Sequence, residues 1–130
     1  MKAKATIVDD FIYCDRRCVV VEINNSNIID ALKQQNIKNS ILLDNLKLRH
    51  NGYIEVTDEE NNLYGDVICD EEITYYDGLE HIYSANGRMY IGFDTAHLYN
   101  NENPETKTRS HVLMKCKNIA NYLGYKLKKV

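Results

Sequence analysis

The chain has 130 residues and a mass of 15.1 kDa, enough for one compact domain whose core needs no metal or disulfide. Its 16 Lys and Arg residues against 19 Asp and Glu residues give a net charge of -3, which excludes a general electrostatic grip on nucleic acid or on an anionic membrane. No apolar run is long enough to span a bilayer, and the N-terminus lacks the apolar segment of a secretory signal. We therefore expect a protein of the cytoplasm.

The four cysteines are too few and too scattered for a disulfide-stapled scaffold, and in a reducing compartment their simplest role is that of small buried hydrophobic residues. Cys14 and Cys18 flank three residues, so on a hairpin with a three-residue loop they would face each other across the strands. A zinc site would need a second pair at ligand spacing, which Cys69 and Cys116 do not supply. We expect no metal and no other cofactor.

Residues 5–13 and 18–23 are rich in β-branched and aromatic side chains around a polar turn, which predicts a β-hairpin. The continuous apolar run at residues 19–21 indicates a strand that is covered on both faces. Ser26 is a candidate N-cap for a short helix near 27–35, whose apolar residues form one stripe.

Further along the chain, Asn51-Gly52 separates two alternating runs at residues 46–50 and 53–56. Because Asn-Gly supplies the positive φ angles that a tight hairpin turn requires, these runs predict a second hairpin. Two shorter strand-like pieces follow at residues 67–69 and 73–76.

The last clear strand covers residues 88–93, and the polar segment 94–104 after it is expected to be a surface loop. A final helix is predicted near 108–123, with apolar residues at helical spacing and an end at Gly124. The whole chain, residues 1–130, is thus expected to form a single α+β domain. Its sheet is largely antiparallel and built from hairpins, and the C-terminal helix packs on one face of the sheet.

Tyrosine is over-represented, with ten residues against two Phe and no Trp. Most of these tyrosines fall in β-like runs, where a half-buried aromatic ring is favoured. A tyrosine ring also offers a rigid stacking face and a hydroxyl for hydrogen bonding, so a binding role stays open.

Asp94 and His97 stand three residues apart just after the last predicted strand. A carboxylate that accepts a hydrogen bond from one imidazole nitrogen would leave the other nitrogen for a ligand or a proton. The simpler interpretation is structural, with Asp94 capping the turn and His97 packing against the helix, because Asp at a strand end often bonds its own backbone.

Residues 51–123 resemble a group of small phage and prophage proteins. In that group a Gly-Tyr-Val strand is followed by Gly-Gly-Leu-Thr-Tyr, by Trp-x-Gly-Phe-Asp-x-Ala-His, and by a last helix with Glu-Cys and Leu-Ala. The corresponding segments here are Gly52-Tyr53-Ile54, Ile73-Thr74-Tyr75, Tyr90-Ile91-Gly92-Phe93-Asp94-Thr95-Ala96-His97, and Lys115-Cys116 with Ile119-Ala120.

This chain departs from the group's pattern at four positions. Glu71 and Glu72 stand in place of the paired glycines, Tyr90 in place of the tryptophan and Lys115 in place of the glutamate. If the glycines let a ligand approach the backbone, two carboxylates there would alter that contact. The resemblance implies a phage origin and action in the cytoplasm of an infected bacterium. It places the shared region at 51–124 and an N-terminal elaboration, a hairpin plus helix, at 1–50.

The first functional hypothesis is a non-enzymatic counter-defence protein that sequesters a nucleotide-derived immune signal or inhibits a host defence protein. Stacking on tyrosine rings, hydrogen bonds to sugar hydroxyls and an arginine for a phosphate would form the site. The candidate ligand-binding residues are Tyr53, Thr74, Tyr75, Arg88, Tyr90, Asp94, His97 and Arg109.

Two alternatives come from other classes of protein. In a small hydrolase, His97 would act as a general base oriented by Asp94. In a structural or regulatory phage protein, the same residues would only stabilise a turn. A homo-oligomer would suit any of these functions, because a small domain often builds its cleft between copies.

Overall fold

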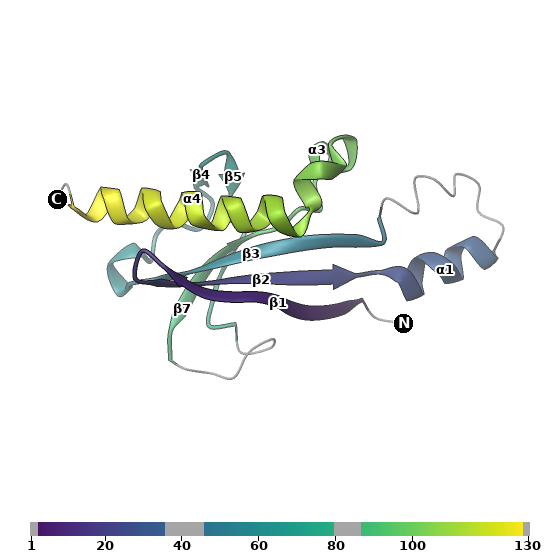
Figure 1. Ribbon diagram of the computed structural model, residues 1–130, viewed down its shortest axis with the longest axis horizontal. Helices are drawn as coiled ribbons and strands as arrows, with labels where there is room; N and C mark the ends of the chain where they lie inside the picture. Colours follow the sequence, from purple (N-terminus) through teal and green to yellow (C-terminus); the bar gives the residue numbers. More distant parts are fainter. Residues whose placement is uncertain (1–2, 36–45, 80–86, 129–130) are drawn as a thin grey trace.

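The computed structural model describes residues 3–35, 46–79 and 87–128, with side chains described as far as residue 124. Its centre is a five-stranded antiparallel sheet in the order β1-β2-β3-β7-β6 (Figure 1). The strands of this sheet are β1 (Lys4–Tyr13), β2 (Arg16–Asn24), β3 (Leu48–Val56), β6 (Tyr75–Asp77) and β7 (Met89–Phe93). A small second sheet pairs β4 (Val67–Ile68) with β5 (Glu71–Glu72). The α-helices are α1 (Ser26–Gln34), α3 (Leu98–Glu102) and α4 (Arg109–Lys128), and there are two 3-10 helices, η1 (Asp58–Glu60) and η2 (Pro104–Lys107). The predicted α+β class is confirmed.

Helix α4 lies across one face of the sheet (Figure 1). Its buried side chains recur at helical spacing, and each Val, Ile or Leu among them contributes about 1.5–3 kcal/mol to stability when it is fully removed from water. They are Val112, Cys116, Ile119, Ala120 and Leu123, and they share one core cluster with Cys18, Val20, Ile54, Ile91 and Phe93 of the sheet. Within the described ranges, no helix combines the length and the apolar character that a membrane span requires.

The opposite face of the sheet has its own apolar cluster, formed by Val19, Val21, Tyr53, Leu79 and Tyr90. In β2, alternate residues therefore enter different clusters: Val20 lies on the α4 side, and Val19 and Val21 lie on the other. All three are at most 1% exposed. This confirms that the continuous apolar run is a strand covered on both faces.

The β1–β2 hairpin has a two-residue turn rather than the expected three-residue loop. Cys14 and Asp15 form this turn, with φ angles of 54° and 60°. A turn with two positive φ angles matches the right-handed twist of the flanking strands. Cys18 therefore lies opposite Phe11, while the Cys14 thiol donates to Asn121 Oδ1 at 3.1 Å, so the predicted cross-strand thiol pair is wrong.

The cysteines also differ in burial. Cys18 and Cys116 are fully buried, as expected, whereas Cys14 is exposed and Cys69 is half-buried. Burial raises the pKa of Cys18 to about 12 and also raises the pKa of Cys116, so both thiols stay protonated and pack as small apolar groups.

The predicted hairpin at Asn51-Gly52 is wrong, because β3 runs straight through both residues. Gly52 lies opposite Phe93 of β7. A Cβ atom at Gly52 would be 2.5 Å from Phe93 Cζ and 2.6 Å from Cys116 Sγ. The glycine is therefore required for close packing of the strand under α4, and not for a turn.

Three element boundaries also differ from expectation. Helix α1 begins at Ser26 itself, whose backbone N–H donates to Asn24 Oδ1 at 2.9 Å, so Ser26 is not the N-cap. The segment expected to be a loop, 94–104, contains α3. Helix α4 continues past Gly124, which has no positive φ and makes no C-cap.

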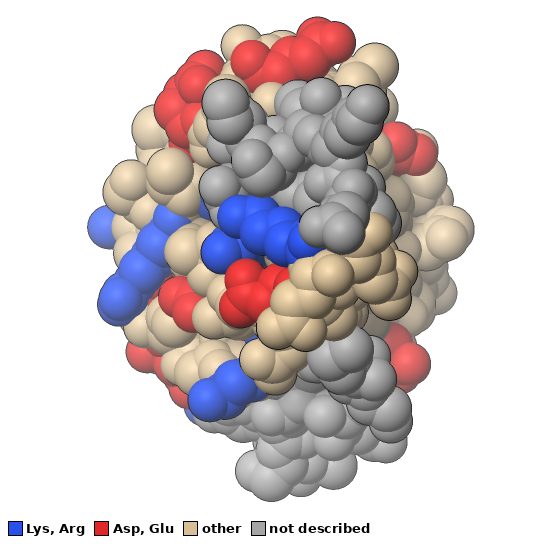
Figure 2. Space-filling model, turned by 90° about the vertical axis from the view of Figure 1, so that its right-hand side faces the viewer, with Lys and Arg blue, Asp and Glu red and all other residues tan. Residues whose placement is uncertain are grey.

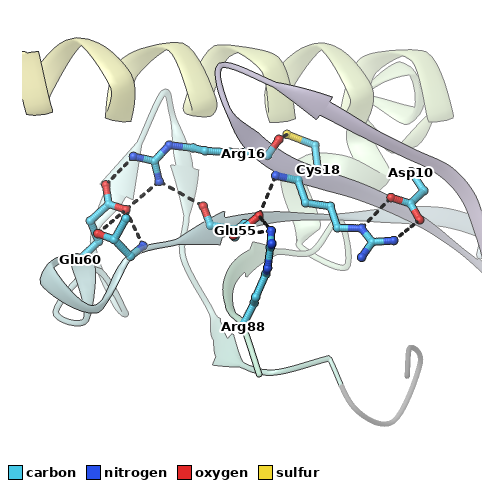
Figure 3. Close-up of polar contacts among 8 residues, drawn as sticks. Asp10, Arg16, Cys18, Glu55, Glu60 and Arg88 are labelled. Atoms are coloured by element: carbon cyan, nitrogen blue, oxygen red, sulfur yellow. Dashed lines mark hydrogen bonds and ion pairs between the residues drawn. The ribbon is translucent and has the colours of Figure 1, made fainter. Parts of the chain in front are cut away.

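A buried ion pair joins the start of β2 to the turn after β3 (Figure 3). Arg16 donates to both carboxylate oxygens of Glu60, at 2.6 and 2.9 Å, and to the carbonyl oxygen of Glu55 at 3.1 Å. The Thr57 N–H also donates to Glu60. Burial by itself raises the pKa of Glu60, but the hydrogen bonds from Arg16 and Thr57 outweigh burial and lower that pKa overall.

Gly52→Ala should destabilise the protein by about 1–3 kcal/mol, because the new methyl group overlaps Phe93 and Cys116. Gly124→Ala is the matched control: in the part of the chain that the structure describes, no neighbouring atom lies within 4 Å of the position that its new methyl group would take, and alanine in a helix should add up to about 1 kcal/mol to the stability. Urea unfolding of both variants measures the two effects. Equal stability of Gly52→Ala and the unsubstituted protein would contradict the packing role.

Glu60→Gln should lower the free energy of unfolding by about 3 kcal/mol at neutral pH, because Arg16 stays buried but loses its charged partner. The pKa of Glu60 is lower in the folded than in the unfolded chain, so its contribution is present above the unfolded value near 4.5 and is lost as the pH falls through the folded value. Urea unfolding across a pH series should therefore show the difference shrinking below about pH 4.5. The exposed neighbour Glu59, changed to Gln, is the control and should have little effect.

Candidate functional site

A hollow of about 300 Å³ opens on the face of the sheet away from α4. Phe93, the last residue of β7, pairs with Gly52, so β3 extends beyond the end of β7. Side chains alternate between the two faces along β3, so Arg49, Asn51 and Tyr53 share the face on which the hollow opens. The lining residues are Arg49, Asn51, Tyr53, Thr74, Tyr75, Phe93, Asp94 and Ala96.

Asp94 is held in a defined orientation at the edge of this hollow. Thr74 donates its hydroxyl to Oδ2 at 3.0 Å, and the Ala96 N–H donates to Oδ1 at 3.0 Å. The second bond is the local turn that Asp commonly forms at a strand end. The buried Thr95 hydroxyl, which donates to the carbonyl oxygen of His50 at 2.8 Å, fixes the same turn to β3.

His97 lies beside Asp94 but does not line the hollow. Its Nε2 atom is 3.3 Å from Asp94 Oδ1, and its side chain is 46% exposed. Its backbone N–H donates to Asn100 Oδ1 at 3.2 Å, at the start of α3. Asp94 therefore stabilises the turn through Ala96 and also contacts the His97 ring.

Tyr53 and Tyr75 form an aromatic wall. Their ring centroids are 5.0 Å apart, and the rings meet edge to face at 80°. Gly92 makes room for this arrangement, because a Cβ atom there would lie 2.5 Å from Tyr53 Cδ1. Burial raises the pKa of Tyr53, so its hydroxyl remains protonated at neutral pH and can donate a hydrogen bond.

Arg49 lines the hollow although the sequence analysis did not select it. Its Nη1 atom donates to Asn51 Oδ1 at 2.6 Å. The missed signal is the alternation itself: on a continuous strand, Arg49 and Tyr53 share a face. The wrongly expected turn at Asn51-Gly52 had placed them on different strands.

Of the eight predicted ligand-binding residues, the structure brings Tyr53, Thr74, Tyr75 and Asp94 together in the hollow, with His97 beside them. Tyr90 is instead 1% exposed within the core cluster of that face.

The two predicted arginines lie elsewhere. Arg88 precedes β7, at the end opposite Asp94, and contacts both carboxylate oxygens of Glu55 at 3.0 and 3.1 Å (Figure 3). Arg109 begins α4 and binds both oxygens of Asp9, at 2.7 and 2.9 Å.

Glu71 of β5 adds a second acidic group near the site. Burial raises the pKa of Glu71, the charges of Lys115 and His97 lower that pKa, and the charge of Asp94 raises it. Its carboxyl group therefore lies within electrostatic range of the Asp94–His97 pair.

Charge is mixed on the end of the molecule that Figure 2 presents, where blue Lys and Arg groups lie next to red Asp and Glu groups. Elsewhere in the ion-pair pattern, Lys47 contacts Asp30 of α1 at 3.2 Å. Any recognition of an anion therefore depends on particular side chains.

Within the described part of the chain, no group of three or more His, Cys, Asp or Glu side chains is placed to hold a metal ion. Comparison with protein-family models, with curated proteins and with solved structures finds no match. The resemblance to phage proteins stays a prediction from the motif.

Asp94→Ala should lower the free energy of unfolding by about 1–3 kcal/mol, because the hydrogen bonds of Thr74 and Ala96 lose their acceptor. His97→Ala should cost less than about 1 kcal/mol, since its contact with Asp94 is largely exposed. Urea unfolding of the two variants gives the comparison. A larger loss for His97→Ala would contradict this order.

Proposed function

We propose that this protein binds a small nucleotide-derived ligand in the hollow without altering it chemically. The observation that carries the proposal is the convergence of an oriented carboxylate, Asp94, with the edge-to-face pair Tyr53 and Tyr75 around one cavity. Ligand pockets commonly combine apolar and aromatic walls with a few fixed polar groups.

The chemistry of the lining fits a nucleoside unit. A fixed carboxylate suits the hydroxyl groups of a ribose, as it does in dinucleotide-binding folds. The Tyr53 and Tyr75 rings offer contact surface to a base, and the protonated Tyr53 hydroxyl offers a donor. A volume of about 300 Å³ lies at the lower end of the range for ligand pockets, which favours a mononucleotide over a dinucleotide.

Binding is better supported than hydrolysis. A general base must reach the proton that it removes, directly or through one water molecule. His97 is outside the lining of the hollow, and its Nε2 atom faces Asp94. Asp94 in turn is engaged by Thr74 and Ala96, as expected for a group that holds a ligand in place.

The phage-like motif supports a biological setting for this binding, namely sequestration of an immune signal during infection. Inhibition of a host defence protein is the second candidate. The observation that favours it is the exposed apolar pair at the start of α3, where Leu98 is 72% and Tyr99 is 64% exposed. Apolar side chains exposed side by side are typical of protein contact surfaces.

A titration followed by 1H–15N NMR should test binding. The probes are the four ribonucleoside 5′-monophosphates, and the amide shifts should cluster at residues 51–53, 74–75 and 92–96. Asp94→Asn retains an oxygen acceptor for its turn and should weaken binding at least about tenfold, because a charged acceptor is lost. His97→Ala is the control and should bind normally.

The recovered probe should be chemically intact by mass spectrometry. A probe that is hydrolysed by the unsubstituted protein but not by His97→Ala would favour the hydrolase instead. Absence of any localised shift with all four probes would contradict nucleotide binding and leave the protein-inhibitor candidate.

A further inference from the structure

The five arginines of the chain all lie in its described parts, and they differ in what their guanidinium groups contact. Four of them contact a carboxylate: Arg16 with Glu60, Arg17 with Asp10, Arg88 with Glu55 and Arg109 with Asp9. Among the described residues, Arg49 makes no such ion pair, and its hydrogen bond goes to the neutral amide oxygen of Asn51. It is also the one of the five that lines the hollow.

The carboxylate of the hollow does not neutralise Arg49. Among the described residues no ion pair joins Arg49 to Asp94, whose oxygens accept from Thr74 and Ala96 and lie beside His97 Nε2. Arg49 therefore places an unneutralised positive charge in the lining of the hollow, where a bound anion would balance it.

Asn51 orients the Arg49 guanidinium without neutralising it. The 2.6 Å bond to Asn51 Oδ1 uses one terminal nitrogen, Nη1, and a guanidinium has five N–H donors in a rigid planar fork. This geometry matches the oxygens of a phosphate, which a guanidinium binds through two parallel hydrogen bonds. A neutral ligand would leave these donors without a charged acceptor.

We infer that Arg49 binds a phosphate group of the ligand, so that the protein selects a phosphomonoester over the corresponding neutral nucleoside. This inference rests on the proposed nucleotide binding and adds its charge requirement. The proposed phosphate site lies on β3, at the part of the strand that extends beyond β7. Arg49 thus takes the phosphate-binding role that the sequence analysis expected of Arg88 and Arg109.

The test compares AMP, GMP, CMP and UMP with their four nucleosides in NMR titrations of the unsubstituted protein and of Arg49→Gln. We expect the best nucleotide to bind at least about tenfold more tightly than its nucleoside. Arg49→Gln should weaken nucleotide binding about 10- to 100-fold, the effect of losing charge-assisted hydrogen bonds, and leave nucleoside binding unchanged.

Arg88→Gln is the matched control, because it removes the same charge at the far end of β7 and should bind the nucleotide normally. Arg49→Lys keeps the charge without the planar fork and should retain intermediate affinity. It also serves as the second variant if Arg49→Gln does not fold.

Equal affinity for nucleotide and nucleoside, or normal nucleotide binding by Arg49→Gln, would overturn the role of Arg49 while leaving nucleotide binding intact. Equal losses in Arg49→Gln and Arg88→Gln would also overturn it, because the effect would then come from net charge. Failure of all eight probes to bind would instead overturn the proposed function.

Discussion

Two reciprocal contacts between β3 and β7 underlie the rest of the structure. Phe93 lies opposite Gly52 on the α4 side, and Tyr53 lies opposite Gly92 on the other side. In each pair the aromatic ring occupies the space that a Cβ atom would need, so an aromatic residue covers a glycine across the strands. The first pair lets Cys116 of α4 approach the sheet, and the second places the Tyr53 ring beside Tyr75. The core and the candidate site therefore depend on the same four positions.

The charged groups divide into those that stabilise the fold and those available for binding. The buried Arg16–Glu60 pair joins β2 to the turn after β3, and its cost of desolvation is offset by good geometry and by the further bonds from Thr57 and to Glu55. Arg49 shows the opposite arrangement, with a neutral partner at the wall of a cavity. This arrangement leaves the charge of Arg49 available to an anion, as the proposed phosphate contact requires.

In the turn after β7, Asp94 has a structural role, and the proposed function adds a binding role for the same carboxylate. Asp94 accepts from Ala96 and Thr74, which fixes its orientation before any ligand arrives. Such preorganisation reduces the entropy lost on binding. Asp94 and Arg49 both line the hollow and form no ion pair with each other among the described residues, so the hollow has a separate anionic and cationic group, as a ligand with both hydroxyl and phosphate groups would require.

Local periodicity along the chain is enough to predict the α+β class, the doubly covered strand at residues 19–21 and the C-terminal helix, because it reports which faces are buried. It also identified Tyr53, Thr74, Tyr75 and Asp94, which the fold brings to one hollow from β3, β6 and the turns beside the sheet. That Asn51-Gly52 continues a strand follows from tertiary packing, because the close contacts of Gly52 with Phe93 and Cys116 outweigh the local turn preference of that pair. Because β3 is continuous, Arg49 and Tyr53 lie on the same face of that strand, and Arg49 lines the hollow. Arg88 and Arg109 instead form ion pairs with Glu55 and Asp9, which no local sequence pattern reveals.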